Sequence, residues 1–208
     1  IDHIGAAFFP GSFLRILGRI SFPIYCYLLT EGVVYTGNRK RYGSRLLIGV
    51  LLAEVPFDLL FFGAWHWGKQ SVMLTLLLGY LYCVAALQFP GLGQRMLLLL
   101  PFALAGEVLK VDYGGWGIVM IGMFLLTRDQ PRRQIQQALW LLLISWMMSR
   151  AMVTIGPVQL RLQLFALAAM VPISLYNRRK ITNNVWVQRA FYLFYPVHLA
   201  VLYVIKKP

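Results

Sequence analysis

Long apolar runs separated by short turns dominate this sequence and constrain its fold more than any other feature. A transmembrane helix needs about 20 mostly apolar residues, with a range of about 17–25. The chain contains nine whole or partial runs of this kind, and Gly, Pro or Asn residues, which favour turns, stand between them. The runs are Ile1–Phe9, Phe13–Tyr35, Tyr42–Phe62, Val72–Phe89, Met96–Leu109, Trp116–Leu126, Ile135–Ile155, Leu160–Tyr176 and Ala190–Ile205. We predict an all-α fold, a polytopic transmembrane helix bundle of about eight to ten spans.

Three of the runs are too short to span a membrane as straight helices. Ile1–Phe9 resembles the second half of a spanning helix, so we expect a truncated first helix with about one more half-span upstream. Met96–Leu109 and Trp116–Leu126 are expected to be tilted, half-buried or re-entrant. Neither strand-like alternation nor a long polar stretch interrupts the pattern. We therefore predict one integral membrane domain over residues 1–208, without strands.

The composition excludes several classes of protein. Hydrophobic residues make up 59% of the chain and charged residues 13%, against about 45–50% and about 25% in soluble domains. A soluble enzyme, a disordered tail and a secreted mini-protein are disfavoured. The net charge of +13 does not predict a nucleic-acid partner, because the basic residues stand at the ends of apolar runs. Cys26 and Cys83 lie inside such runs and are expected to be buried thiols, and no cluster has the spacing of metal ligands.

Lys and Arg residues in short loops predict the orientation, because cytoplasmic loops carry an excess of them. Twelve lie in one set of alternate loops and four in the opposite set. The first set holds Arg39, Lys40, Arg41, Arg45, Arg95, Arg128, Arg132, Arg133, Arg178, Arg179, Lys180 and Arg189, and the second holds Lys69, Lys110, Lys206 and Lys207. We expect the first set to be cytoplasmic and the C-terminus to lie outside.

Ionisable residues inside the apolar runs are the candidate functional groups, because such groups usually face a protein interior and have a partner. They are Asp2, His3, Arg15, Arg19, Glu31, Glu54, Asp58, Glu107 and His198. Arg15 and Arg19 are four residues apart and share one helix face, as do Glu54 and Asp58.

The depth of each group follows from a rise of about 1.5 Å per helical residue. His3 and Arg19 lie about 9 Å from the outer end of their runs and Asp58 lies at a similar depth, whereas His198 lies about 12 Å and Glu54 about 15 Å from the outer end. The first three and His198 are therefore expected to meet at one level. A purely structural ion pair between Arg19 and Asp58 is the alternative. His66, between Trp65 and Trp67, is interpreted as part of an interfacial aromatic belt.

These groups have the chemistry that general-base catalysis needs. A neutral imidazole can act as general base for an amine or hydroxyl that attacks a carbonyl. A carboxylate such as Asp2 can fix the imidazole tautomer, although adjacent helical residues diverge and Asp2 can instead bind another helix. An arginine can bind an anion or a developing oxyanion. The basic segment Asn38–Arg45 has two interpretations, a positive-inside signal that binds phospholipid headgroups or a phosphate-binding mouth for a nucleotide-bearing donor.

Several blocks of the sequence together resemble the TraX family, whose best-known member is the F-pilin acetylase. The blocks are IDHIGAAFFP (Ile1–Pro10), LRILGRISFPIYCYLLTEG (Leu14–Gly32), RYGSRLLIGVLLAEVPFDLLF (Arg41–Phe61), VMLTLLLG (Val72–Gly79) and FYPVHLAVLY (Phe194–Tyr203). The resemblance covers nearly the whole chain in order, and residues 90–188 carry little of it. The matching positions are Asp2, His3, Arg19, Pro23, Glu31, Glu54, Pro56, Asp58, Thr75 and His198. Ser71 stands where the family usually has Asn.

The resemblance implies a multi-pass acyltransferase of the bacterial inner membrane that uses acetyl-CoA and no metal. The expected acceptor is the N-terminal amine of a pilin-like protein, with a sugar, lipid or peptide amine as alternatives. We assign catalysis to His3, Asp2 and His198, with His3 as base or as a transient acyl carrier. Substrate contacts are assigned to Arg15, Arg19, Glu31, Glu54, Asp58 and Thr75, and CoA contacts to Arg39, Lys40, Arg41 and Arg45. The rival hypotheses are a transporter or lipid-binding membrane protein, and a pilin assembly factor without chemistry.

Overall fold

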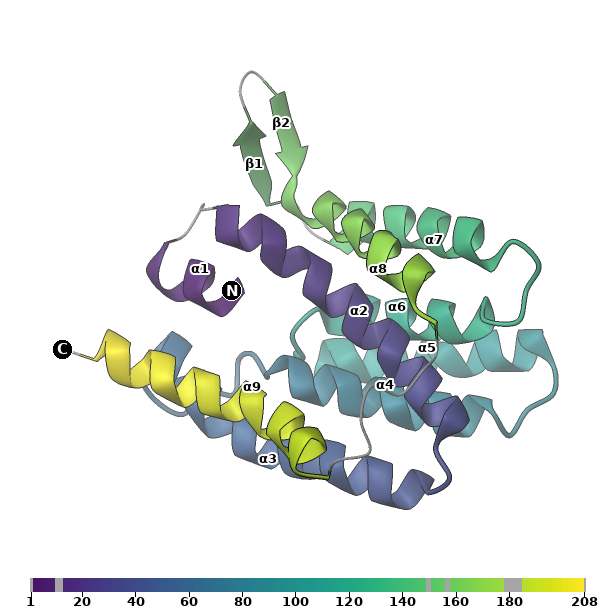
Figure 1. Ribbon diagram of the computed structural model, residues 1–208, viewed down its shortest axis with the longest axis horizontal. Helices are drawn as coiled ribbons and strands as arrows, with labels where there is room; N and C mark the ends of the chain where they lie inside the picture. Colours follow the sequence, from purple (N-terminus) through teal and green to yellow (C-terminus); the bar gives the residue numbers. More distant parts are fainter. Residues whose placement is uncertain (1, 10–12, 149–150, 156–157, 178–184, 208) are drawn as a thin grey trace.

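The computed structural model describes residues 2–9, 13–148, 151–155, 158–177 and 185–207. These residues are mostly helical, with one β-hairpin (Figure 1). The α-helices are α1 (Asp2–Phe8), α2 (Phe13–Tyr35), α3 (Arg39–Phe62), α4 (Val72–Ala86), α5 (Leu92–Val108), α6 (Gly114–Leu126), α7 (Arg133–Met148), α8 (Met170–Leu175) and α9 (Val185–Lys206). A 3₁₀-helix, η1, covers Leu162–Ala169, and two strands, β1 and β2, cover Met152–Ile155 and Val158–Arg161.

The predicted runs and the observed helices agree closely in the first two thirds of the chain. α2 has the predicted bounds, and α3 begins three residues earlier than predicted, at Arg39. The earlier start follows from Asn38, whose side-chain oxygen accepts a hydrogen bond of 2.8 Å from the backbone N–H of Arg41. α3 ends at Phe62 and is capped by Gly63, which adopts a left-handed φ of 74° that favours glycine.

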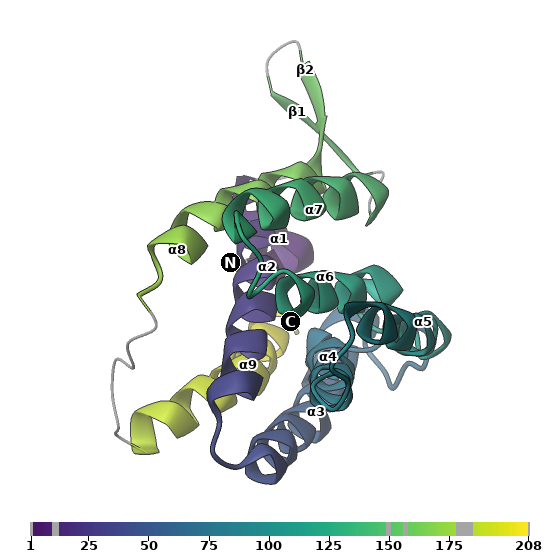
Figure 2. The same cartoon turned by 90° about the vertical axis from the view of Figure 1, so that its right-hand side faces the viewer.

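The prediction of helices across Ile135–Ile155 and Leu160–Tyr176 is wrong in part. α7 ends at Met148, and β1 pairs antiparallel with β2, with Met152 opposite Arg161. The β-branched residues Val153, Thr154 and Ile155 favour a strand over a helix. The hairpin stands out from the helices beyond α7 (Figures 1 and 2). The expectation that the chain has no strands is therefore incorrect.

α2 is the central helix of the bundle. It packs against α1, α4, α6 and η1, and in Figure 2 it runs from the level of α7 and α8 down to the layer of α3 and α9. Its inward face contributes Phe22, Cys26 and Tyr27 to the main apolar core. Cys26 and Cys83 are both fully buried free thiols, as predicted.

α3 and α9 form a second packed pair, and they run side by side in the same direction (Figure 1). The guanidinium of Arg45 lies 5.9 Å from the ring centre of Tyr192 near the start of both helices. Near their ends, Lys206 Nζ donates a 3.0 Å hydrogen bond to the carbonyl of Leu60. The two contacts fix the register of α3 against α9.

The connections between helices gather at two opposite ends of the bundle. At one end, Tyr80 donates to the Arg39 carbonyl at 2.6 Å, and Tyr82 donates to the Arg95 carbonyl at 3.1 Å. At the other end, Gln70 and Val111 form a parallel β-bridge, and Lys69 Nζ lies 2.9 Å from Asp112 Oδ1. Arg39, Arg95 and Arg133 lie in the first turns of α3, α5 and α7, and Arg128 follows α6, all at the first end (Figure 1). Arg178, Arg179 and Lys180 lie outside the described residues.

Among the described helices, α2 meets the length and hydropathy of a membrane span, with 23 residues and a mean hydropathy of 1.2 over its most apolar window. The segments Val72–Ala86, Gly114–Leu126, Leu162–Leu175 and Tyr192–Lys206 are apolar but shorter. The mainly helical class is thus confirmed, and the number of spans stays a prediction.

Candidate functional site

Two histidines from opposite ends of the chain meet at the contact of α1 with α9. His3 Nδ1 and His198 Nε2 lie 3.1 Å apart, and the two ring centres lie 5.0 Å apart. The His3 ring also contacts Tyr195 of α9 at 5.5 Å and Phe61 of α3 at 6.0 Å. The depth estimate from the sequence placed these two imidazoles at one level, and the geometry confirms that they meet.

The hydrogen bonds of the pair determine its neutral tautomers. His198 Nδ1 lies 2.9 Å from the carbonyl oxygen of Phe194, one turn earlier in α9. Because a carbonyl oxygen only accepts, the proton of neutral His198 is on Nδ1, and its Nε2 is an acceptor. His3 must then donate to it from Nδ1–H, which leaves the lone pair of His3 Nε2 available as a base.

Asp2 binds helix α2 and does not hold the neighbouring imidazole. Its Oδ2 accepts a hydrogen bond from Arg19 Nη2, and its Oδ1 lies 3.4 Å from Arg15 Nε. Of the two predictions for Asp2, contact with another helix is the one that the geometry shows. The predicted ion pair of Arg19 with Asp58 is wrong, because the carboxylate beside Arg19 is that of Asp2.

Gly18 makes this contact possible. A Cβ atom at position 18 would lie 2.2 Å from the Cβ of Asp2 and 2.5 Å from its Oδ1. Only a residue without a side chain lets the Asp2 carboxylate lie directly against the backbone of α2 between Arg15 and Arg19. The glycine therefore sets how closely α1, and with it His3, approaches the bundle.

The two acidic residues of α3 hold the connection between α3 and α4. Asp58 Oδ2 accepts a 3.0 Å hydrogen bond from the backbone N–H of His66. Glu54 accepts 2.7 Å and 3.1 Å bonds from the hydroxyl and backbone N–H of Ser71, the residue before α4. Ser71 is fully buried and was not predicted as a partner of Glu54. The His66 ring stacks on Phe62 at 3.9 Å, next to exposed Trp65 and Trp67.

Glu31 lies at the other end of α2 from the histidines. It is twelve residues after Arg19, or about 18 Å along the helix. Its Oε1 accepts a 2.8 Å hydrogen bond from Nε of Arg128, whose guanidinium also lies 5.0 Å from the ring centre of Tyr35. The structure therefore separates Glu31 from the other predicted substrate residues and places it in an ion pair between α2 and the end of α6.

A stacked aromatic pair connects the arginines to α4. The rings of Phe22 and Tyr113 are parallel at 3.7 Å, and the Arg19 guanidinium lies 5.6 Å from the Tyr113 ring centre. Thr75 of α4 is fully buried. A Cβ at Gly117 would lie 2.8 Å from both Thr75 Cγ2 and Tyr113 Cβ, so Thr75 and Tyr113 are neighbours at this position. The Thr75 hydroxyl has no hydrogen-bond partner among the described residues.

The predicted CoA-binding residues lie at the start of α3. Arg39, Lys40 and Arg41 are exposed in its first turn, and Arg45 is partly buried against Tyr192 of α9. Tyr192 precedes His198 by six residues, which is about 9 Å along the helix axis. Of the four cations, Arg45 is the one whose side chain contacts α9, the helix that carries His198.

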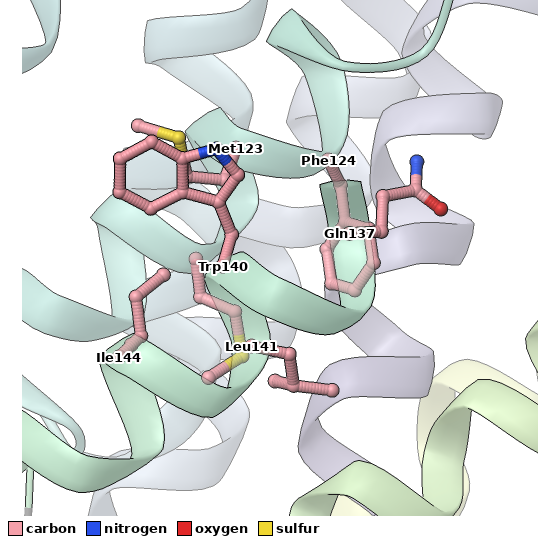
Figure 3. Close-up of a pocket in the computed structure, with 7 residues that line it drawn as sticks. Met123, Phe124, Gln137, Trp140, Leu141 and Ile144 are labelled. Carbon is pink, nitrogen blue, oxygen red and sulfur yellow. The ribbon is translucent and has the colours of Figure 1, made fainter. Parts of the chain in front are cut away.

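A small cavity between α6 and α7 is separate from these groups. It holds about 10 Å³, enough for a single water molecule. Figure 3 shows Trp140 and Gln137 beside it, and the other lining residues are Met120, Met123, Phe124, Leu141 and Ile144. An acyl group does not fit there. Within the part of the chain that the structure describes, no group of three or more His, Cys, Asp or Glu residues could hold a metal ion.

Comparisons with known proteins find relatives but no solved fold. The profile of the TraX protein family matches residues 1–206. A protein of Dichelobacter nodosus, "Probable fimbrial assembly protein FimC, serogroup H1", is 28% identical over 220 residues, which cover 97% of this chain and 88% of that protein. No solved structure matches the chain.

Proposed function

Since this chain belongs to the TraX family, we propose that it is a multi-pass acyltransferase of the bacterial inner membrane. It moves an acetyl group from acetyl-CoA to an acceptor amine, the N-terminus of a pilin-like protein. The observation that carries this proposal is the contact between His3 and His198, which joins the first and last described helices at 3.1 Å.

The tautomers support His3 as the general base. The acceptor amine attacks the thioester carbonyl carbon, and the lone pair on His3 Nε2 takes the proton that the amine loses. The positive charge on His3 is shared with His198 through their hydrogen bond. When the C–S bond breaks, the proton passes to the leaving thiolate, and both imidazoles return to their neutral state.

Arg19 and Asp2 support the reaction by position and charge. Asp2 is adjacent to His3 in α1 and holds the guanidinium of Arg19 against that helix. A guanidinium near the base binds an anionic substrate group or the oxyanion that forms at the carbonyl. Asp2 acts through Arg19 and α1, as a positioning residue.

The route of the donor follows α3 and α9. Arg39, Lys40 and Arg41 lie at the start of α3, and Arg45 contacts Tyr192, about 9 Å from the level of His198. Arg39 is six residues before Arg45, about another 9 Å. An extended donor with its phosphates at this basic end can span a distance of this order, while the acceptor approaches from the opposite end.

The test compares the three histidines of the chain as single alanine variants, purified in lipid nanodiscs. Transfer of labelled acetyl from acetyl-CoA to a pilin-like peptide is the measured rate. We expect His3→Ala and His198→Ala to lose at least about 100-fold in turnover. His66→Ala, which removes the stack on Phe62 and the packing against Gly68, is the matched control and keeps the wild-type rate. Full turnover in both His3→Ala and His198→Ala contradicts the mechanism.

A pilin assembly factor without chemistry is the second candidate, and the name of the Dichelobacter nodosus relative favours it. It binds pilin and leaves its mass unchanged. The mass of the pilin N-terminal peptide, measured from cells with and without this chain, distinguishes the two functions. An acetylated N-terminus that depends on the chain supports the transferase, and an unmodified N-terminus with lost pili supports the assembly factor.

A further inference from the structure

Tyr195 is the aromatic residue that contacts both members of the histidine pair. Its ring centre lies 5.5 Å from that of His3 and 5.3 Å from that of His198, edge-on to each. Tyr195 is three residues before His198, so the two side chains share one face of α9. The phenol is therefore held against the groups that move the proton in the proposed reaction.

The hydroxyl of Tyr195 is buried, and no described acceptor takes its proton. Its oxygen lies beside the backbone N–H of Val72, the first residue of α4. The hydroxyl of Thr75, one turn further along α4, is likewise buried without a partner. Buried hydroxyls in proteins almost always donate to an acceptor, so two buried hydroxyls without a described acceptor near the same helix start can serve an acceptor oxygen of a substrate.

We propose that Tyr195 is a catalytic residue whose hydroxyl donates a hydrogen bond to the carbonyl oxygen of the thioester as that oxygen becomes an oxyanion. This inference rests on the acyltransferase function proposed above. The acceptor nitrogen forms a bond to the carbonyl carbon, and the π electrons of the C=O bond move to the oxygen. Tyr195 keeps its proton throughout. The C=O bond re-forms as the C–S bond breaks, and the amine proton travels through His3 to the thiolate.

The position of the hydroxyl is suited to this role. Tyr195 contacts the base through its ring, so a carbonyl oxygen that binds its hydroxyl is held on the side of α9 where the histidine pair lies. Arg19, which interacts with the Tyr113 ring, is the second donor on the same side of the bundle. Two donors, one neutral and one cationic, are a usual arrangement for stabilising an oxyanion.

The test substitutes Tyr195→Phe, which keeps the ring contacts with both imidazoles and removes only the hydroxyl. We expect kcat to fall about 100-fold, with the KM for acetyl-CoA and the melting temperature unchanged. Tyr203→Phe is the matched control, because Tyr203 lies on the same helix, eight residues after Tyr195, and packs against the same cluster of Phe57, Leu60 and Leu199. It should keep wild-type kinetics.

Chloroacetyl-CoA supplies a readout that a structural role would not change. Its chlorine stabilises the oxyanion itself, so the deficit of Tyr195→Phe should shrink with this donor. An equal loss with both donors, or a lower melting temperature that accounts for the loss, overturns the assignment. Wild-type kcat in Tyr195→Phe refutes it while leaving the acyltransferase function in place. A wild-type protein that transfers acetyl to no acceptor refutes the proposed function, and the inference with it.

Discussion

Gly18 offers a way to move the catalytic base without changing any polar group. The substitution Gly18→Ala places a methyl carbon 2.2 Å from the Cβ of Asp2 and 2.6 Å from its Cγ. Carbon atoms in contact normally lie about 3.5–4.0 Å apart, so α1 must move away from α2 by about 1.3–1.8 Å. His3 moves with α1, and its 3.1 Å contact with His198 is lengthened past the hydrogen-bond limit of about 3.5 Å.

A displacement of about 1 Å at a catalytic group can lower the rate about 100-fold, and we expect a loss of this size in Gly18→Ala. The effect on stability is smaller. Crowding costs about 1–3 kcal/mol, and the better helix propensity of alanine offsets about 1 kcal/mol of it. The net loss is about 0–2 kcal/mol. Acetyl transfer in nanodiscs and the melting temperature measure the two effects separately.

Gly93→Ala in α5 is the matched control, because a Cβ at that position meets nothing within 4 Å. It should keep the wild-type rate, with equal or higher stability. A wild-type rate in Gly18→Ala would refute the reasoning, because it would show that the approach of α1 to α2 does not place the base. A rate that falls equally in Gly93→Ala would show that the assay responds to any added methyl group.

Two further predictions concern charged residues at the end of the bundle that lies away from the histidine pair. Glu31→Gln leaves the Arg128 guanidinium, 12% exposed, with the exposed carboxylate of Asp129 as its ion-pair partner, and should lower the free energy of unfolding by about 2 kcal/mol. Chemical unfolding checks this, and equal stability of variant and wild type would contradict it. Replacing Arg39, Lys40 and Arg41 together by alanine should raise the KM for acetyl-CoA about tenfold, or about 1.4 kcal/mol, with kcat unchanged. The double variant Arg132→Ala, Arg133→Ala on a neighbouring connection is its control, and an equal KM rise there would show a general charge effect instead of a phosphate site.

The apolar runs predicted most of the helices because each helix depends on local hydrophobicity and local end signals. α2 follows its run at both ends, and the start of α3 follows from Asn38. The hairpin was missed because β1, with the sequence MVTI, is as apolar as the end of a span, so the run before it was extended through the strand. β-branched residues decide the outcome there, and their effect on a short segment is weak compared with the hydrophobicity of the whole run.

The sequence by itself determined that ionisable groups lie inside apolar helices, and counting residues along each helix brought His3 and His198 to one level. Only the tertiary structure decided which helix faces contact each other. In the structure Arg19 forms an ion pair with Asp2 instead of Asp58. Glu54 accepts a hydrogen bond from Ser71, and Glu31 forms an ion pair with Arg128. The physical reason is that depth along a helix follows from its own residue count, whereas the rotation of one helix against another depends on the packing of all of them together.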